Sequence, residues 1–266
     1  MKVAMTDNPF HPGGYYHPEV DPAQLKISEL YSEHISGIDL EVSRMWKFVE
    51  LTQSSLTRSN VESWSDQFGS IDTSIYKGII SRFRPSRIIE VGAGASTVEA
   101  SRQIVASSID CELIAIDPFP NRTEFEVLES LDVTLLKLRV QEVKSELFQQ
   151  LQPNDILFVD TSHCAKTGSD VLDIFFRVLP TLAPGVLIHV HDIFYPFEYP
   201  FEWIFGQTRS WNEIYFLRAL LSYHSTLRVQ LFNDLLYQSD PTRLRSLLGV
   251  HSGGRPGSIW LVNEQN

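Results

Sequence analysis

Residues 88–97 read IIEVGAGAST, an apolar run with an acid near its end and then a turn that holds two glycines. Such a run followed by such a turn is typical of a buried strand that leads into a helix. Gly92 and Gly94 allow positive φ values and let a ligand approach the backbone without meeting a Cβ atom. The sequence therefore predicts the strand, tight turn and helix on which many α/β folds bind a nucleoside.

The helix after the turn is expected over residues 98–105, with Ser96 or Thr97 as its cap. Its first N–H groups would face the crevice above the sheet. A dinucleotide fingerprint needs a third glycine, which would fall at Thr97 and is absent, so pyrophosphate binding is disfavoured. Glu90, at the end of the strand, instead suits a cationic ligand such as the amino and sulfonium groups of S-adenosylmethionine. A plain corner without a ligand is the alternative.

A second acid ends the next apolar run, residues 111–117, about 25 residues after the first glycine. In nucleotide-binding α/β folds, a carboxylate at this place binds the ribose hydroxyls. Asp117 is therefore the expected ribose ligand. The alternative is a solvated turn aspartate before Pro118.

The composition limits the class of partner. The chain has 266 residues, of which 43% are hydrophobic and 21% are charged, and this suits one large globular domain with additions. The formal net charge of −11 and a pI near 5.2 argue against a nucleic-acid partner, because binding a phosphate backbone requires a basic face. Small neutral or cationic substrates fit this charge better.

The cysteines and the apolar runs indicate a compartment. Cys111 and Cys164 lie in or beside predicted strands without the spacing of a paired motif, so free thiols in a reducing cytoplasm are expected. The first residues carry an acid too early for a secretory signal, and no run of about 18 apolar residues occurs. We therefore expect a cytoplasmic protein with no membrane partner.

The chain divides into an N-terminal part and a main domain. Residues 1–22 lack a helical or strand period, whereas residues 22–49 and 70–83 have helical spacing. Residues 1–67 are thus expected to form an arm and helices, and residues 68–266 the main domain. Strands are predicted at residues 87–91, 112–117, 133–140, 155–160, 185–192, 227–232 and 258–262.

Helical stretches separate the first five of these runs. This alternation predicts a doubly wound α/β fold, in which a parallel sheet carries helices on both faces. Residues 253–257 are rich in glycine and are similar to a hairpin connection, which would let the last strand enter the sheet antiparallel.

The order of these elements matches a known family. Glu90-x-Gly92-x-Gly94 follows the first strand, Asp117 the second and Asp160 the fourth. With further motifs, this order resembles the class I S-adenosylmethionine-dependent methyltransferases, in particular a bacterial group of largely unassigned substrate. The further motifs are residues 155–163, 184–192, 196–200, 211–213 and 257–261, and the resemblance spans residues 68–262. It implies a Rossmann-like, seven-stranded, mostly parallel sheet with an antiparallel last strand, and S-adenosylmethionine as cofactor.

In that family the loop after the third strand holds the adenine ring, and the matching residues here are 140–143. Gln141 or Glu142 would then accept a hydrogen bond from the exocyclic amine or flank the ring. The alternative is that both residues only begin a solvated helix over residues 143–151. The residues expected to contact the cofactor are Glu90, Gly92, Ala93, Gly94, Ser96, Thr97, Asp117, Gln141, Glu142 and Asp160.

Asp160 and Asp192 end the fourth and fifth strands. Adjacent parallel strands lie about 4.8 Å apart, so both carboxylates should reach one crevice, where they repel unless a cation or a proton lies between them. With His191 they form an expected site for Mg²⁺ or Mn²⁺. Certain sugar and natural-product O-methyltransferases have a similar magnesium site, with an acid in place of His191, so a site without metal is the alternative. His189 shares a strand face with His191, and core packing fits it better than ligation.

His163 lies three residues after Asp160 and is the expected general base for methyl transfer to a hydroxyl, because imidazole titrates near neutral pH. In the similar O-methyltransferases, a histidine at this place acts as the base. Asp160 or Asp192 would orient His163. The alternative is that His163 caps a helix over residues 166–176.

Residues 194–211 are dense in aromatic side chains and prolines. Such a stretch after the fifth strand is expected to form a wall or lid of an acceptor pocket, so residues 194–224 are predicted as a lid insertion. Aromatic rings also attract a sulfonium. A hydrophobic patch through which copies of the chain form a homo-oligomer is the alternative.

Three functions fit these observations. The first is S-adenosylmethionine-dependent methyl transfer to a small-molecule acceptor, at a hydroxyl oxygen of a sugar or natural product, with or without a metal. The second is a regulatory or assembly module that binds S-adenosylmethionine without transfer. The third is an enzyme of the same fold with other metal-assisted chemistry, such as cyclisation or hydrolysis. The candidate base His163 and the lid favour the first.

Overall fold

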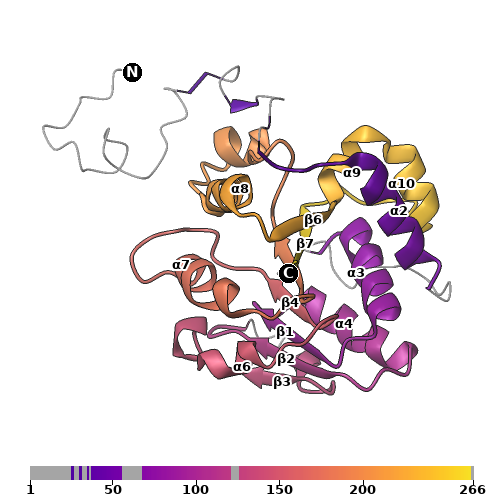
Figure 1. The fold of residues 1–266 in the computed structure, drawn as a ribbon, viewed down its shortest axis with the longest axis vertical. Helices are drawn as coiled ribbons and strands as arrows, with labels where there is room; N and C mark the ends of the chain where they lie inside the picture. The colour runs from indigo at the N-terminus through magenta and orange to yellow at the C-terminus, as the bar shows by residue number, and fades with distance from the viewer. Residues whose placement is uncertain are drawn as a thin grey trace, which may run out of the picture.

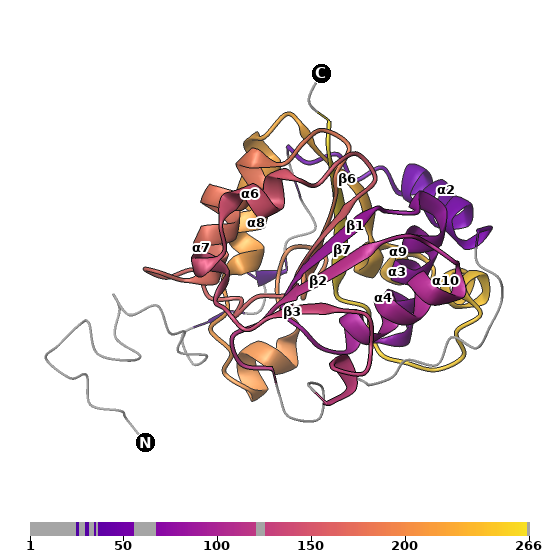
Figure 2. The same ribbon diagram turned by 90° about the horizontal axis from the view of Figure 1, so that it is seen from below.

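The computed structural model describes residues 25–26, 30–31, 35, 37–55, 68–120 and 126–264. In this part of the chain, a central sheet lies between two layers of helices (Figures 1 and 2). The predicted arm, residues 1–22, lies outside the described residues. None of the helices found in the described ranges has the length and apolarity needed to cross a bilayer.

Seven strands form one sheet in the order β3-β2-β1-β4-β5-β7-β6. Neighbouring strands among β1 to β5 pair in parallel, whereas β7 runs antiparallel to both of its neighbours. The predicted doubly wound, mostly parallel sheet with an antiparallel last strand is thereby confirmed. The strands are β1 (Arg87–Val91), β2 (Glu112–Ile116), β3 (Thr134–Leu136), β4 (Ile156–Val159), β5 (Leu187–His191), β6 (Leu227–Phe232) and β7 (Ser258–Asn263).

Two details of the sheet differ from expectation. The strand predicted over residues 133–140 is only β3, because its one partner, β2, ends at Ile116 and later residues have no strand to pair with. The chain forms the 3₁₀ helix η2 (Val140–Glu142) instead. The hairpin predicted at residues 253–257 is wrong, since α9 (Asn233–Ser239) and α10 (Pro241–Leu248) connect β6 to β7.

The helices cover both faces of the sheet (Figure 2). One face, at the right of that view, carries α9, α10, α2 (Val42–Gln53), α3 (Ser70–Phe83) and α4 (Ala95–Ala106). The other carries α6 (Ser145–Gln149), α7 (Asp170–Asp173) and α8 (Glu213–Tyr223). The structure also contains two short π helices, η3 (Ile174–Val178) and η5 (Glu202–Gly206), and the 3₁₀ helix η4 (Leu179–Thr181).

The helices before the sheet match the prediction in part. The helix predicted over residues 70–83 is confirmed as α3, whose buried side chains recur at helical spacing. The helix predicted over residues 22–49 is wrong at residues 37–41, which are not helical and begin with Gly37 at a φ of 78°. A left-handed residue interrupts a right-handed helix, so α2 begins only at Val42 and continues to Gln53.

The turn between β1 and α4 depends on Gly92. This residue has a φ of 92°, in the left-handed region that favours glycine, and a Cβ atom on it would lie 2.4 Å from the carbonyl oxygen of Asp160. The ends of β1 and β4 can therefore meet only because residue 92 has no side chain. Gly94 has a φ of 179°, which is extended backbone, so the positive φ predicted for it is wrong.

The predicted cap of the following helix is also wrong. α4 begins at Ala95 with Gly94 as the cap residue, so Ser96 and Thr97 lie inside its first turn. The N–H of Gly94 donates to the hydroxyl oxygen of Thr97 at 3.1 Å. The threonine thus satisfies a free N–H group at the helix start from within the helix.

We predict that Gly92→Ala lowers the free energy of unfolding by about 3 kcal/mol, because an L side chain in the left-handed region adds to a steric overlap. Gly168→Ala is the matched control: Gly168 also has a positive φ, of 75°, but a Cβ there meets no atom within 4 Å. Gly168→Ala should lower the free energy of unfolding by only about 1 kcal/mol. Urea denaturation measures both, and equal losses would show that the contact with Asp160 does not matter.

Candidate active site

Glu90, in β1, supports the glycine turn from inside the protein. Its side chain is fully buried and accepts hydrogen bonds from Tyr76 at 2.8 Å and from the hydroxyls of Thr97 and Ser96. Burial raises the pKa of Glu90 to about 7, although the three hydroxyls act in the opposite direction. Glu90, Ser96 and Thr97 therefore point at one another and stabilise the turn.

Asp117 lies directly against the same turn. One oxygen of its carboxylate accepts a hydrogen bond from the backbone N–H of Ala93 at 3.1 Å, and the other from that of Phe119 at 2.7 Å. The glycine turn and the acid after β2, which the sequence separates by more than twenty residues, are thus in contact. The parallel pairing of β1 with β2 brings them there.

The two residues expected near an adenine ring differ in their surroundings. The Glu142 carboxylate binds the backbone N–H and the guanidinium of Arg139, at 2.9 and 3.2 Å. The Gln141 amide donates to the carbonyl oxygen of Gly168 at 2.9 Å. Its own Oε1 atom is buried and accepts no hydrogen bond from the described residues. Within the described residues, the Gln141 Oε1 atom is therefore an acceptor without a partner, whereas both carboxylate oxygens of Glu142 bind Arg139.

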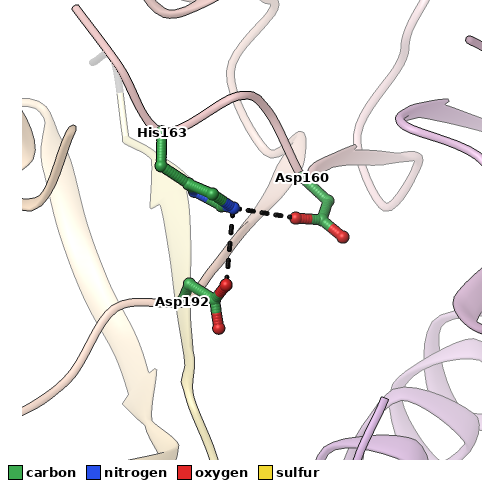
Figure 3. Close-up of side chains that lie close together, drawn as sticks. All are labelled: Asp160, His163 and Asp192. Carbon is green, nitrogen blue, oxygen red and sulfur yellow. Dashed lines mark ion pairs between the residues drawn. The ribbon is translucent and has the colours of Figure 1, made fainter. Parts of the chain in front are cut away.

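Asp160, His163 and Asp192 come together at the carboxyl ends of β4 and β5 (Figure 3). The Nε2 atom of His163 lies 3.3 Å from Oδ1 of Asp160 and 3.4 Å from Oδ2 of Asp192. One ligand atom from each of the three residues falls within a span of 4.8 Å. The sequence prediction that both strand-end carboxylates reach one place is borne out by this geometry.

A fourth group, Glu213, approaches His163 from the opposite side of the ring. Its Oε2 atom lies 2.8 Å from Nδ1 of His163 and also accepts a hydrogen bond from the Thr161 hydroxyl at 2.9 Å. The carboxyl is fully buried. The backbone N–H groups of Asn212 and Glu213 donate to the His163 carbonyl, so the start of α8 fixes the histidine loop.

His163 and Asp192 have unusual backbone conformations. Their φ values are 57° and 56°, in the left-handed region that residues other than glycine rarely occupy. Such residues persist where the surroundings fix them, and they are frequent at functional sites. Here the hydrogen bonds to Glu213 and to the α8 backbone provide that constraint for His163.

The charges around His163 decide its protonation. Burial lowers the pKa of its imidazole, but hydrogen bonds and charge interactions with Asp160 and Glu213 outweigh burial and raise the pKa to about 11. The same contact with His163, with the charge of His191, lowers the pKa of Asp160 against the effect of burial. The raised pKa favours the imidazolium form of His163 at neutral pH.

His191, predicted as a metal ligand, lies on the other face of the sheet edge. Successive residues of a strand point to opposite faces, so His191 faces Phe68, with ring centroids 5.5 Å apart, while Asp192 faces His163. Burial lowers the pKa of His191, but Asp192, Asp160 and Asp72 raise it to about 9. Among the described residues, the cluster able to hold a metal includes His163 in the place predicted for His191.

Two alternatives from the sequence can be compared with the structure. His163 does not cap the next helix, because α7 begins at Asp170 and the Ser169 hydroxyl accepts the N–H of Leu172. His189 stacks on Phe158 with ring centroids 3.8 Å apart, and its ring nitrogens have no partner among the described residues. His189 is thus packed in the core.

Glu213 is the site residue that the sequence interpretation missed. The sequence motif 211–213 includes it but indicates no role for it. A signal was present: Ile214 and Leu217 are apolar neighbours on a helix that packs inward, and an acid that shares their buried surroundings needs a partner. Nothing in the sequence pattern named His163 as that partner.

The aromatic segment after β5 packs beside the cluster. The Trp211 ring lies 4.3 Å from the imidazole of His163, and Trp211 also contacts Trp203 and Tyr199. Phe194 and Phe197 are buried in the core. Part of the segment predicted as a lid therefore touches the site, and part anchors it to the sheet.

Comparison with known proteins is consistent with this geometry. Residues 89–193, from β1 to just beyond β5, match the family model described as a methyltransferase domain (Methyltransf_24). With the sheet order and the glycine turn, this match defines a class I methyltransferase fold. Residues 89–193 are accordingly similar to a methyltransferase domain.

The chain is also similar to individual proteins. An uncharacterized protein of Archaeoglobus fulgidus is 25% identical over 169 residues, which cover 55% of this chain and 76% of that one. The plantazolicin methyltransferase BpumL, in complex with a triazolic desmethylPZN analog and SAH, is 13% identical, with a TM-score of 0.49 over 86% of this chain and 100% of that one. An O-methyltransferase from Bacillus cereus in complex with SAH is 13% identical, with a TM-score of 0.47 over 83% and 90%.

We predict that Glu213→Gln lowers the pKa of His163, because it removes a carboxylate that stabilises the imidazolium. In the unaltered protein, NMR of the imidazole nitrogens should show His163 protonated at pH 8, and in the variant the titration should move to lower pH. Glu142→Gln, at an exposed carboxylate paired with Arg139, should leave it unchanged. A His163 that titrates near 6.5 in the unaltered protein would contradict the assignment.

Proposed function

We propose that this protein transfers the methyl group of S-adenosylmethionine to a hydroxyl oxygen of a small-molecule acceptor, such as a sugar or natural product. The observation that carries the proposal is the cluster of Asp160, His163 and Asp192 at the carboxyl edge of the sheet. It adjoins the glycine turn, because Asp160 is the residue whose carbonyl meets Gly92. Ligands of wound sheets bind at this edge.

The cofactor would occupy the turn and its neighbours. The cofactor would contact the backbone of Gly92, Ala93 and Gly94. The Asp117 carboxylate would release the backbone N–H of Ala93 and accept hydrogen bonds from the ribose hydroxyls instead. The unused Oε1 atom of Gln141 supports a hydrogen bond from the adenine amine. Glu90, Ser96 and Thr97 would act by shaping the turn, since their side chains bind one another.

Methyl transfer is an in-line displacement at carbon. The acceptor oxygen forms a bond to the methyl carbon while the carbon–sulfur bond breaks, its electron pair stays on sulfur, and the hydroxyl proton leaves to a base. His163 can take that proton only as neutral imidazole. The carboxylates of Asp160 and Glu213 hold it as imidazolium, so a positive charge beside the cluster would lower the pKa of His163 toward the range of a base.

A divalent cation fits the donors present here. Two carboxylate oxygens lie 3.3 and 3.4 Å from one imidazole nitrogen, close to the roughly 3 Å between neighbouring ligands of an octahedral ion with bonds of about 2.1 Å. Oxygen-rich donor sets with one imidazole suit Mg²⁺ or Mn²⁺. Such an ion would supply charge stabilisation for an ionised acceptor hydroxyl. In that case His163 would serve as a ligand, and the acceptor proton would go to another group.

We predict that Asp117→Ala weakens binding of S-adenosylhomocysteine by about 10-fold to 100-fold, because two charge-assisted hydrogen bonds to the ribose are lost. Calorimetry measures this affinity, and Asp110→Ala, at an exposed position before β2, is the control. The unaltered protein should transfer labelled methyl to members of a hydroxylated acceptor library. Binding without any transfer would contradict the proposal and favour a regulatory module.

We predict that Mn²⁺ binds the protein and that Asp192→Asn weakens this binding by about 10-fold or more, because a charged ligand is lost. Electron paramagnetic resonance of Mn²⁺ gives the affinity without an activity assay. Glu142→Gln is a control outside the cluster. If methyl transfer survives EDTA and Mn²⁺ binding is the same in both variants, the metal part of the proposal fails and transfer without metal remains.

A further inference from the structure

Arg209 lies in a corner between two tryptophans. Its guanidinium carbon is 4.0 Å from the centroid of the Trp203 ring and 4.4 Å from that of Trp211. The two indoles are nearly perpendicular, at 81°. The backbone N–H of Arg209 donates to the carbonyl of Trp203 at 2.8 Å, so the chain folds back on itself and fixes the cation there.

The N–H groups of this guanidinium meet no partner in the part of the chain that the structure describes. Within the described residues, the side chain of Arg209 makes no hydrogen bond and no ion pair, only its two ring contacts. A guanidinium that stacks through its face keeps five N–H donors in its plane. The faces of the Arg209 guanidinium therefore contact the two indoles, whereas the N–H donors along its edge bind none of the described residues.

The other arginines over aromatic rings differ in this respect. Within the described part of the chain, each of them also binds an oxygen through its N–H groups. The pairs are Arg177 with Asp173, Arg243 with Glu50, Arg245 with the Gly253 carbonyl and Arg255 with Asp234. Among the arginines that lie over aromatic rings in the described residues, Arg209 is thus the one that binds no oxygen, in a protein whose acids outnumber its basic residues by 33 to 22.

Arg209 is also close to the proposed chemistry. The Trp211 ring that it contacts lies 4.3 Å from the imidazole of His163, so a single indole separates the guanidinium from the cluster. The buried acid on this side, Glu213, is already bound to His163 and Thr161. Within the described residues, no oxygen pairs with the Arg209 guanidinium, so its N–H groups can bind an oxygen of a bound molecule.

We propose that Arg209 binds an oxyanion of the methyl acceptor, a carboxylate or a phosphate, and so selects anionic hydroxylated substrates. This inference rests on the proposed function of the site. Arginine matches the geometry of both oxyanions with paired N–H donors. The net charge of the chain favours neutral or cationic substrates, but Arg209 provides a local positive charge on the side of the site that Trp211 covers.

The test compares hydroxylated probes in matched pairs. The pairs are 3,4-dihydroxybenzoate with 3,4-dihydroxybenzamide, and glucose 6-phosphate with glucose. Binding to the protein saturated with S-adenosylhomocysteine is followed by tryptophan fluorescence, because Trp203 and Trp211 contact the guanidinium. In at least one pair, the anion should bind about 10-fold more tightly than its neutral partner. The probe pair in which the anion binds more tightly shows whether Arg209 prefers a carboxylate or a phosphate.

Variants assign the preference to Arg209. Arg209→Met should abolish it, and Arg209→Lys should retain part of it, because lysine keeps the charge without the paired donors. Arg243→Met is the matched control, since Arg243 also stacks on a tryptophan, Trp46 at 4.2 Å, but already pairs with Glu50. It should keep the preference, and all three variants should bind S-adenosylhomocysteine as the unaltered protein does.

The outcomes separate this inference from the proposed function. If no anion binds more tightly than its neutral partner, or if Arg209→Met keeps the preference, the role of Arg209 is overturned even where methyl transfer occurs. If the preference exists and is lost in Arg209→Met but no acceptor is methylated, the anion site stands and the proposed transfer fails.

Discussion

The close approach of carboxylates around one imidazole is the constraint on which the site depends. Asp160, Asp192 and Glu213 come from two strand ends and a helix, and each would repel the others without the proton on His163. Glu213 is fully buried, and a buried carboxylate without a partner is costly. The imidazolium thus links β4, β5 and α8 electrostatically, and the left-handed backbone of His163 is maintained by the same bonds.

Much of the fold follows from local sequence patterns, because parallel strands buried on both faces are continuous apolar runs. The convergence of Asp160 and Asp192 was predictable for the same reason, since parallel strands end at one edge. Strand alternation also indicates that His191 faces away from His163, although its Nδ1 atom still lies 3.3 Å from Oδ1 of Asp192. The bond between Glu213 and His163 was not predictable, because fifty residues separate them and only the packing of α8 on the sheet brings them together.

Contact with the aromatic segment gives the site two different sides. Toward the sheet, the groups are acids and one imidazolium, whereas toward residues 203–211 they are indoles and a guanidinium. Trp211 contacts both the imidazole and the guanidinium, so the two sides meet across one ring. Under the proposed function, this difference in charge would favour one orientation of the acceptor.

The position of β7 has a consequence for how the protein forms. β7 is the last strand along the chain but lies in the interior of the sheet, between β5 and β6. During synthesis on the ribosome, β5 and β6 both leave an unpaired edge until residues 258–263 have emerged. The half of the sheet that carries Asp192 can therefore reach its final state only after β7, which follows β6, α9 and α10 along the chain, has been translated. Truncated nascent chains would present two open edges to chaperones or to each other.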